Sequence, residues 1–225
     1  MSIVQSAVRT IVVDDHPVVH LGLRSLFDGE DWLDVIGEAF TPEAALAEIE
    51  RSSPDLVIID LSLGQIQSSG LHLVRDVRER WPAIRVLVLT MHDETLYAGR
   101  AIRAGAHGYV TKRDAVRDLV DAIRIVMGGD TYLKHGTDSL NDHVAHTDVP
   151  PATGVRSLSD RELEVYEMIG RGLGTREIAE LLNVSVKTIE THRGRIKGKL
   201  RIASTQQLVR SAVQWATLDS DSANL

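Results

Sequence analysis

Five short apolar runs, separated by stretches with helical spacing, fill roughly the first 130 residues and restrict the folds open to this chain. Each run is nearly continuous in apolar residues and is bounded by acidic or turn-forming residues, a pattern typical of parallel strands buried on both faces. The stretches between them repeat apolar residues at helical intervals. This alternation predicts a doubly wound α/β domain with a five-stranded parallel sheet. The expected strands cover residues 10–13, 33–36, 56–59, 86–89 and 108–110.

The clearest helical stretch follows the fifth run. Asp114 stands where an N-cap side chain would satisfy free backbone donors, and the glycines at 128–129 mark the end of the helix. Four apolar residues between these limits have the i, i+3, i+4, i+7 spacing of a helix face that packs on a core. They are Val116, Leu119, Val120 and Ile123.

The composition changes after residue 133. Residues 134–155 combine Gly, Asp, His, Thr and Asn with a Pro pair and show no apolar period, which predicts a flexible linker. Residues 156–225 carry helix signals and no strand signals. We therefore expect a first domain over residues 1–133, a linker over 134–155 and a small all-α domain over 156–225.

Capping residues divide the second domain into four expected helices. Ser159 and Glu162 form the sequence pattern of a capping box at the start of the first. Thr175 is the expected cap of a second helix over residues 176–182, and Ser185 that of a third over 186–200. The fourth is expected at about residues 205–217. A short turn between the second and third helices is typical of a helix-turn-helix.

Charge is distributed unevenly along the chain. The net charge of -7 argues against nucleic acid as a partner, but residues 156–225 carry 11 Lys and Arg against 9 Asp and Glu, while residues 1–155 carry 14 against 23. Residues 185–201 alone hold six basic residues and one acid. This local cationic stripe predicts that the second domain, and not the first, contacts nucleic acid.

Other features of the composition bear on the class of protein. The chain has no cysteine, which excludes disulfides and thiolate metal sites and is typical of a reducing compartment. No run approaches the roughly 18 apolar residues that a membrane span requires, and the first residues lack the pattern of a secretory signal. We therefore expect a cytoplasmic protein without a membrane association.

Polar residues follow four of the expected strands. Asp14 and Asp15 come after the first, Asp60 after the third, Thr90 ends the fourth and Lys112 follows the fifth. In a doubly wound sheet these positions share the carboxyl edge, where a crevice opens between neighbouring strands. Three carboxylates crowded there need a counter-ion, and a hard divalent cation such as Mg²⁺ binds through oxygen.

The same residues resemble the receiver domain of response regulators. The resemblance covers residues 8–130 and implies a flavodoxin-like sheet. Asp60 and Thr90 are 30 positions apart, and Thr90 and Lys112 are 22 positions apart, as in that family. It rests on Asp14, Asp15, the run DLSL at residues 60–63, Thr90 and Lys112.

The resemblance implies a phosphorylation site. Asp60 would accept a phosphoryl group from a sensor histidine kinase to form an aspartyl phosphate. Thr90 and Lys112 would contact the phosphoryl oxygens, and Tyr109 is at the position of the family's switch aromatic residue. The implied metal ligands are Asp14 through water, Asp15, Asp60 and the Ser62 main-chain oxygen. Such a protein is not an enzyme except for its own phosphorylation and dephosphorylation.

One loop departs from the family pattern. Gly64 stands where the family usually has Pro, and Gly70 lies ten positions beyond Asp60, two more than usual. We therefore expect residues 65–69 to form a longer, polar loop beside the pocket. Its effect on a docking partner is left open by the sequence.

Residues 156–218 resemble the LuxR-type output domain of the NarL/FixJ response regulators. The resemblance rests on LSDRELEV at residues 158–165 and IAELLNVSVKTIETH at residues 178–192. It implies that the helix from Val186 lies in the major groove, with Ile189, Ile196 and Leu200 facing the core. The implied DNA-contacting residues are Lys187, Thr188, Glu190, Thr191, Arg193, Gly194, Arg195, Lys197 and Lys199.

Together the two resemblances imply a transcriptional response regulator. Its implied partners are a sensor histidine kinase, double-stranded promoter DNA, a second copy of the chain on activation or DNA binding, and RNA polymerase as a candidate. We expect dimer contacts at the fourth and fifth strand-helix units and at a stripe of Leu208, Ala212 and Trp215. Kinase, stimulus, operator and the direction of regulation are not encoded in any residue.

Two alternatives stay open from the sequence. The first is a DNA-binding regulator whose receiver domain no longer needs phosphorylation. The second is a flavodoxin-like phosphatase, which is opposed because no Gly-rich phosphate loop occurs and no acid stands two positions beyond Asp60. Turnover of a phosphomonoester would distinguish the phosphatase from both regulators.

Overall fold

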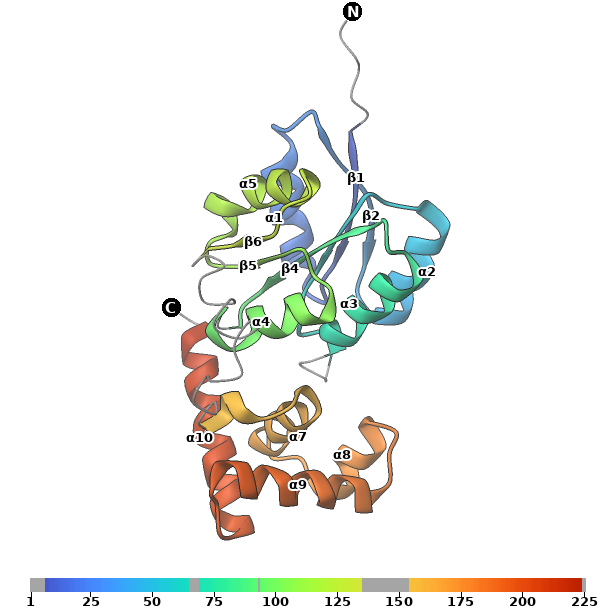
Figure 1. Ribbon diagram of the computed structural model, residues 1–225. Coiled ribbons are helices and arrows are strands. Elements are labelled where there is room, and N and C mark those ends of the chain that lie inside the picture. Colours follow the sequence, from blue (N-terminus) through green and yellow to red (C-terminus); the bar gives the residue numbers. More distant parts are fainter. Residues whose placement is uncertain (1–6, 65–68, 93, 135–153, 224–225) are drawn as a thin grey trace, which may run out of the picture. The chain divides into compact units, whose positions relative to one another are not determined.

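The structure is a computed structural model that describes residues 7–64, 69–92, 94–134 and 154–223 (Figure 1). The chain forms two compact units, Met1–Asn141 and Asp142–Leu225. The expected domain limits at 133–134 and 155–156 stay predictions, because residues 135–153 lie outside the described residues. Within the described residues no helix combines the length and apolar character needed to cross a bilayer.

The first unit contains a fully parallel sheet of six strands in the order β2-β1-β3-β4-β5-β6. The strands are β1 (Val8–Val13), β2 (Leu33–Ala39), β3 (Leu56–Ile59), β4 (Arg85–Thr90), β5 (Gly108–Thr111) and β6 (Tyr132–Leu133). All five expected strands are present, and the flavodoxin-like neighbourhood of the first and third is confirmed. Apart from Val8 at the start of β1, the apolar residues of β1, β3 and β4 are buried almost completely, as expected for central strands.

The sixth strand was not expected from the sequence. Tyr132 and Leu133 pair with Gly108 and Tyr109 of β5. Periodicity cannot reveal a strand of two residues. Gly108 permits the close approach, since a Cβ there would lie 2.6 Å from a Leu87 methyl and 3.2 Å from the Tyr132 Cβ.

Five helices cover the sheet, with α1 and α5 on one face and α2, α3 and α4 on the other (Figure 1). They are α1 (Pro17–Phe27), α2 (Pro42–Ser52), α3 (Ser69–Arg80), α4 (Glu94–Ala104) and α5 (Ala115–Met127). Leu23 and Phe27 of α1 share one apolar cluster with Leu119 and Ile123 of α5. This two-sided arrangement confirms the doubly wound fold.

Two details of α5 differ from the expectation. Leu119 and Ile123 are fully buried, but Val116 is 85% exposed, because the buried stripe begins one residue earlier, at Ala115. Asp114 does occupy the N-cap position, yet its side chain makes no capping bond. It instead accepts hydrogen bonds from side chains of Thr111, Arg117 and Lys134.

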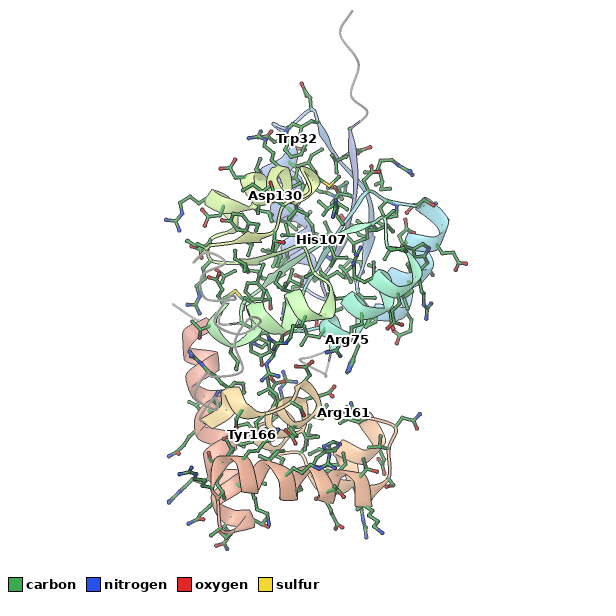
Figure 2. The ribbon with its side chains drawn as sticks, in the orientation of Figure 1. Trp32, Arg75, His107, Asp130, Arg161 and Tyr166 are labelled. Atoms are coloured by element: carbon green, nitrogen blue, oxygen red, sulfur yellow. The ribbon has the colours of Figure 1, made fainter. Side chains whose placement is uncertain are left out.

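The second unit is helical, and each expected helix is present. It contains the 3-10 turn η1 (Gly154–Ser157), then α7 (Asp160–Gly170), α8 (Thr175–Leu181), α9 (Val186–Leu200) and α10 (Thr205–Ala223). The capping box of Ser159 and Glu162 is confirmed, as is the Ser185 cap of α9. Arg161 ties α7 to the end of α8 by donating to the Leu182 carbonyl at 3.2 Å (Figure 2).

The predicted cap of α8 was wrong. Thr175 is the first helical residue, and Gly174 is the N-cap, whose amide donates to the Glu177 carboxylate at 2.6 Å. The Thr175 hydroxyl is used elsewhere, as acceptor for Arg193 of α9 at 3.1 Å. The sequence could not show this use, because it depends on how α8 packs on α9.

The last helix packs inside its own unit. Leu208 and Ala212 are fully buried, and the Trp215 ring lies 5.9 Å from the Tyr166 ring of α7 (Figure 2). The Leu208 and Ala212 side chains are therefore not available for the predicted dimer contact, which stays a prediction for the partly exposed Trp215. Among the described side chains of α10, the exposed large apolar ones are Val209 and Val213, at 38% and 42%.

Candidate functional site

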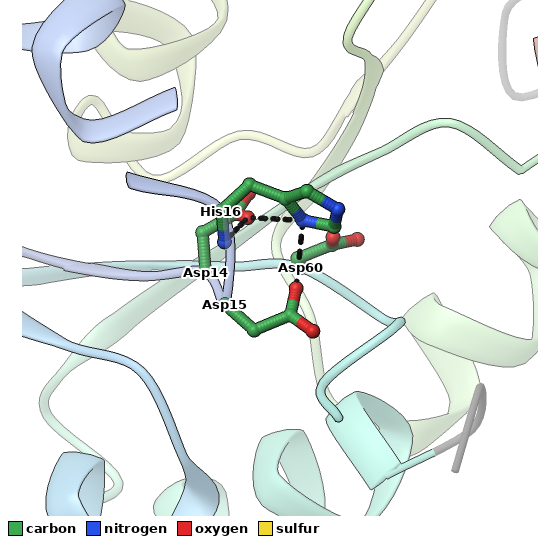
Figure 3. Close-up of side chains that lie close together, drawn as sticks. All are labelled: Asp14, Asp15, His16 and Asp60. Atoms are coloured by element: carbon green, nitrogen blue, oxygen red, sulfur yellow. Dashed lines mark hydrogen bonds and ion pairs between the residues drawn. The ribbon is translucent and has the colours of Figure 1, made fainter. Parts of the chain in front are cut away.

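An acidic pocket lies at the carboxyl edge of the sheet, where β1 and β3 end side by side. Asp14 and Asp60 are almost completely buried, at 2% and 3% exposure, and Asp15 is at 27%. The Asp60 amide donates to the Val13 carbonyl at 2.9 Å, so the two strand ends are held in register. One ligand atom from each of Asp14, Asp15, His16 and Asp60 lies within 4.8 Å of the others (Figure 3).

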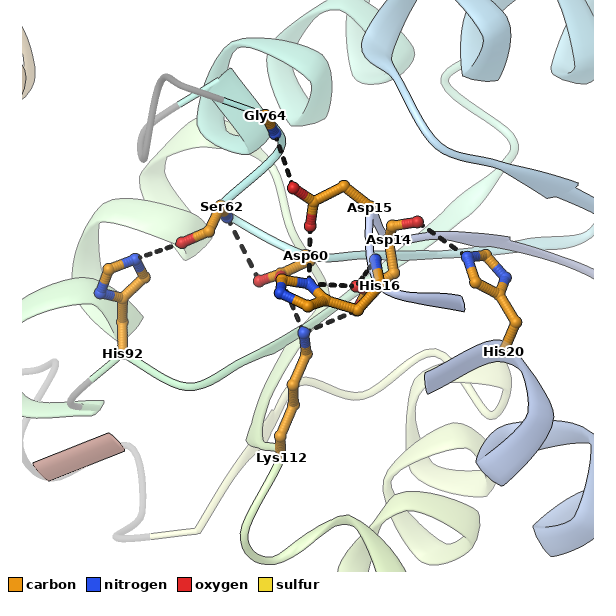
Figure 4. Close-up of polar contacts among 9 residues, drawn as sticks. All are labelled: Asp14, Asp15, His16, His20, Asp60, Ser62, Gly64, His92 and Lys112. Atoms are coloured by element: carbon orange, nitrogen blue, oxygen red, sulfur yellow. Dashed lines mark hydrogen bonds and ion pairs between the residues drawn. The ribbon is translucent and has the colours of Figure 1, made fainter. Parts of the chain in front are cut away.

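Lys112 bridges two of these carboxylates. Its Nζ is 2.6 Å from Asp14 Oδ2 and 2.7 Å from Asp60 Oδ2 (Figure 4), and its amide donates to the Thr90 carbonyl at 2.8 Å. Burial disfavours the charged ammonium, but Asp60 and Asp14 outweigh that cost, so the pKa of Lys112 is raised. The lysine is therefore held protonated beside the predicted acceptor.

His16 is a pocket residue that the sequence interpretation missed. Its Nδ1 lies 2.7 Å from Asp15 Oδ1 and 3.2 Å from Asp14 Oδ1, while the side chain is 61% exposed (Figure 3). Its amide also donates to Asp14 Oδ1 at 2.9 Å. The only signal in the sequence was its place directly after the Asp pair.

The donor set of the pocket fits a hard divalent cation. Three carboxylates converge on it, two of them buried, and the single ammonium of Lys112 leaves an excess of negative charge. Carboxylate oxygens are the ligands that Mg²⁺ takes in proteins, and buried charges of one sign require compensation. The Ser62 amide donates to Asp60 Oδ1 at 3.2 Å, which fixes the start of the next loop beside the pocket.

Thr90 and Tyr109 complete the predicted set. The Thr90 hydroxyl is buried and has no hydrogen-bond partner among the described residues, so a donor remains for an oxygen ligand. Tyr109 is 1% exposed and donates its hydroxyl to the His92 carbonyl at 2.9 Å. The predicted switch residue, Tyr109, is thus turned inward in this structure.

Two contacts through His92, which the sequence did not predict, connect the loop after Asp60 to Tyr109. Ser62 Oγ lies 2.8 Å from His92 Nε2 (Figure 4), and the main chain of His92 accepts from Tyr109. The His92 ring also stacks on Tyr97 at 4.3 Å. Ser62 was predicted only through its main-chain oxygen, and His92 was not singled out at all.

Glycines shape the loop after Asp60. The Gly64 amide donates to Asp15 Oδ2 at 3.0 Å, and its φ of 69° suits glycine. A Cβ on Gly70 would lie 2.1 Å from the Asp60 carbonyl oxygen, so the start of α3 packs directly on the main chain of Asp60. The expected longer loop at 65–69 falls largely on residues 65–68, which lie outside the described residues.

The second candidate site is the exposed face of α9. Ile189 and Ile196 are fully buried and Leu200 partly so, which leaves the opposite face to solvent. The predicted DNA-contacting residues divide into two groups by exposure. Exposed are Lys187, Glu190, Thr191, Gly194, Arg195 and Lys199, and partly buried are Thr188, Arg193 and Lys197.

Two residues of this face also hold the unit together. Lys199 Nζ lies 2.6 Å from Glu162 Oε2, the side chain that closes the capping box of α7. Burial raises the pKa of Glu162, but Lys199 and Ser159 outweigh burial and lower it. Arg193 donates to Thr175 as described above. Lys199 and Arg193 therefore each make a contact inside the unit and are also predicted to contact DNA.

Two protein-family models match the chain. The model described as response regulator receiver domain matches residues 10–124, and the model described as bacterial regulatory proteins, luxR family, matches residues 156–212. The oxygen regulatory proteins NreC of Staphylococcus carnosus and Staphylococcus haemolyticus are 36% and 35% identical over 216 residues, which cover 94% of this chain and 99% of each relative.

Solved structures agree with these matches. RcsB from Salmonella enterica serovar Typhimurium, bound to the rprA promoter in the presence of a phosphomimetic, is 25% identical with a TM-score of 0.70, covering 91% of this chain and 98% of that chain. A LuxR-family response regulator from Aurantimonas sp. is 32% identical with a TM-score of 0.56, covering 63% of this chain and 100% of that chain.

A doubly wound sheet with an acidic pocket at its carboxyl edge, followed in one chain by a helix-turn-helix unit, defines a two-component response regulator. Within that class this chain belongs to the NarL/FixJ-type family, which combines a receiver domain with a LuxR-type DNA-binding domain.

Proposed function

We propose that a sensor histidine kinase phosphorylates Asp60 and that the phosphorylated chain regulates transcription from promoters bound by α9. The observation that carries this proposal is the environment of Asp60. The carboxylate is 3% exposed and lies 2.7 Å from a protonated Lys112, and the neighbouring strand β4 ends at Thr90, whose buried hydroxyl has no hydrogen-bond partner among the described residues. We place the protein in the cytoplasm, where kinase domains and DNA are available.

The proposed reaction is phosphoryl transfer to a carboxylate. An Asp60 oxygen attacks the phosphorus of a phosphohistidine, a P–O bond forms, the P–N bond breaks, and the imidazole keeps the electron pair and takes up a proton. Lys112 and Thr90 bind the phosphoryl oxygens. Bound Mg²⁺ would neutralise charge on those oxygens. Its proposed ligands are Asp14 through water, Asp15, Asp60 and the Ser62 main-chain oxygen.

Phosphorylation is directly testable with a small-molecule phosphodonor and Mg²⁺. The wild type should take up one phosphoryl group, and Asp60→Asn should take up none, since the nucleophile is lost. Asp114→Asn is the matched control, because its carboxylate lies outside the pocket, on Lys134 and Arg117. Labelling of Asp60→Asn at the wild-type level would overturn the assignment, and equal operator binding with and without label would favour the phosphorylation-independent alternative.

The DNA proposal assigns α9 to the major groove. The structures of RcsB include complexes with promoter DNA, and one is described as two dimers on two parallel DNAs. For this chain, exposed Glu190 and Thr191 are placed to read base edges, while Lys187 and Arg195 contact phosphates. Footprints across a salt titration test it: Glu190→Ala should lose affinity for the operator by about 1 to 3 kcal/mol and hardly change binding to random DNA.

We further propose that the active form is a homodimer and that RNA polymerase is a downstream partner. The exposed apolar residues of the first unit include Val18 and Leu21 on α1 and Val116 on α5. These helices cover the same face of the sheet. A second copy of the chain would bury them together.

A further inference from the structure

His20 is a buried histidine of α1 that contacts the strand end carrying the acidic pair. It is 3% exposed, and its Nε2 lies 2.8 Å from the main-chain oxygen of Asp14 (Figure 4). Because a carbonyl oxygen can only accept, Nε2 must carry the proton and donate it. The function described above uses no atom of this residue.

The contacted oxygen belongs to the peptide group that joins Asp14 to Asp15. The amide of Asp14 already donates to the Ala39 carbonyl of β2 at 3.1 Å. The bond from His20 therefore fixes the second polar group of the Asp14 main chain, at the point where β1 ends. The orientation of this peptide group determines where the following carboxylate, that of Asp15, is directed.

Packing alone does not explain a histidine at this position. The ring lies 4.6 Å from the Phe40 ring, a contact that an apolar side chain would make without burying polar atoms. Its Nδ1 has no hydrogen-bond partner among the described residues, and the nearby Glu38 carboxylate is 4.0 Å away and bonded to Arg24. A buried, unsatisfied ring nitrogen costs free energy. The bond to Asp14 is the compensating interaction that the structure offers.

We infer that His20 is a positioning residue for the divalent-cation site, acting through the Asp14–Asp15 peptide group. This inference rests on the proposed function, which places a cation on these carboxylates. Loss of a residue that orients a metal ligand through a hydrogen bond typically lowers cation affinity by about 10-fold or more. Loss of the His20 donor should therefore weaken cation binding without removing any ligand.

The test uses the full chain with Mn²⁺ as probe, followed by the electron paramagnetic resonance signal of free Mn²⁺ and by displacement with Mg²⁺. Three substitutions separate the donor from the ring. His20→Gln places an amide donor near the position of Nε2, whereas His20→Asn ends near Nδ1 and cannot reach the carbonyl. His20→Phe keeps the aromatic packing without a donor, and Phe40→Leu removes the ring contact but leaves the donor.

The Kd for Mn²⁺ should rise about 10-fold in the Asn and Phe variants, and should stay within about 3-fold of wild type in the Gln and Phe40→Leu variants. Metal-free melting temperatures identify any variant that fails to fold, and the Asn and Phe variants serve as alternatives to each other. Wild-type affinity in a folded Asn or Phe variant, or a Gln variant as weak as Asn, would overturn the role of His20. Absence of Mn²⁺ binding by the wild type would instead overturn the cation site itself.

Discussion

At the scale of single residues, Lys112 is the main electrostatic support of the pocket. It is 13% exposed and contacts two carboxylates that are almost fully buried. Removing one partner of a buried ion pair leaves an uncompensated charge, which costs far more than losing a pair on the surface. The negative charge of the pocket therefore requires positive charge, either from Lys112 or from a bound cation.

We expect Lys112→Gln to lower the free energy of unfolding by about 3 kcal/mol at neutral pH without divalent cations. Mg²⁺ should restore part of this loss, because it compensates the same carboxylates. Denaturant unfolding with and without Mg²⁺ measures both effects. Lys134→Gln is the control: its ion pairs with Asp114 and Asp118 are more exposed, so it should lower stability clearly less than Lys112→Gln and show no Mg²⁺ dependence. Equal losses in the two variants would contradict this account.

His107 lies directly before β5, at the edge of the sheet opposite the acidic pocket, and makes the free energy of unfolding depend on pH (Figure 2). Burial, together with Arg78 and Arg85, lowers its pKa to about 4, and its Nδ1 accepts from the Val86 amide at 3.0 Å. In the unfolded chain the same group protonates near pH 6.5. Between about pH 6.5 and 4 the unfolded state therefore binds the extra proton, and stability should fall as the pH is lowered, by at most about 1.4 kcal/mol per pH unit from this group.

Unfolding curves across this pH range test the assignment. His107→Asn keeps an acceptor for the Val86 amide but cannot titrate. Its stability should therefore change less with pH than that of the wild type. An unchanged slope in the Asn variant would show that other groups produce the pH dependence.

At the scale of elements, the start of α3 packs closely against the main chain of Asp60 and Leu61, directly after β3. A Cβ on Gly70 would lie 2.1 Å from the Asp60 oxygen and 2.5 Å from the Leu61 Cα, both main-chain atoms that cannot move independently. A glycine is thus required here because the two elements approach each other closely.

Gly70→Ala should lower stability by about 1 to 3 kcal/mol and slow phosphorylation, because it displaces Asp60 or α3. Gly22→Ala on α1 is the matched control, since a Cβ there would meet nothing within 4 Å, and alanine should raise stability by up to about 1 kcal/mol. Thermal unfolding and phosphodonor labelling provide the readouts. Normal stability and labelling in Gly70→Ala would mean that the two elements separate easily.

In helix α9, Lys199 combines a proposed DNA contact with an ion pair inside its own unit. Lys199→Ala should weaken binding to all DNA sequences, lower the salt slope by about 1, and also destabilise the second unit by about 1 kcal/mol, because Glu162 loses its ion pair. Among the described residues no ion pair joins the exposed Lys187 side chain to α7, so Lys187→Ala should change the salt slope alone. Salt-titrated DNA binding and thermal unfolding of the two variants separate the roles. Identical stability of both would argue that the Glu162 contact contributes nothing.

At the scale of the whole molecule, we propose that phosphorylation alters assembly. Val18 and Leu21 of α1, at 71% and 69% exposure, would bury apolar surface against a second copy, as would Val116 of α5 at 85%. Tyr109 is turned inward in this structure, where its hydroxyl donates to the His92 carbonyl. Phosphorylation would then bias an existing equilibrium.

A beryllium fluoride mimic of phosphorylation should shift the wild type toward dimers in sedimentation at a given concentration. Leu21→Asp should oppose the shift, because a carboxylate would be buried at the contact. Glu50→Lys on α2, on the other face of the sheet, should leave it unchanged. If Leu21→Asp dimerises like the wild type, the dimer contact lies elsewhere in the molecule.

The sequence alone determined the order of elements, the polar residues at the strand ends and the basic helix of the second unit. These follow from local rules: apolar periodicity selects strand or helix, and the carboxyl ends of parallel strands share one edge. For this reason the sequence alone predicts Asp14, Asp15, Asp60, Thr90 and Lys112 at one edge of the sheet, and Ser159 and Ser185 as caps.

Only the tertiary structure decided which partners those residues have. His16, His20 and His92 reach the pocket region from positions that no periodicity marks, Thr175 serves α9 instead of capping α8, and β6 consists of two residues beside Tyr109. For the same reason Leu208 and Ala212 of α10 are buried inside their own unit, whereas Val116 of α5 is exposed to solvent. Periodicity defines a helix face, but packing between elements distant in sequence decides whether that face meets another element or solvent.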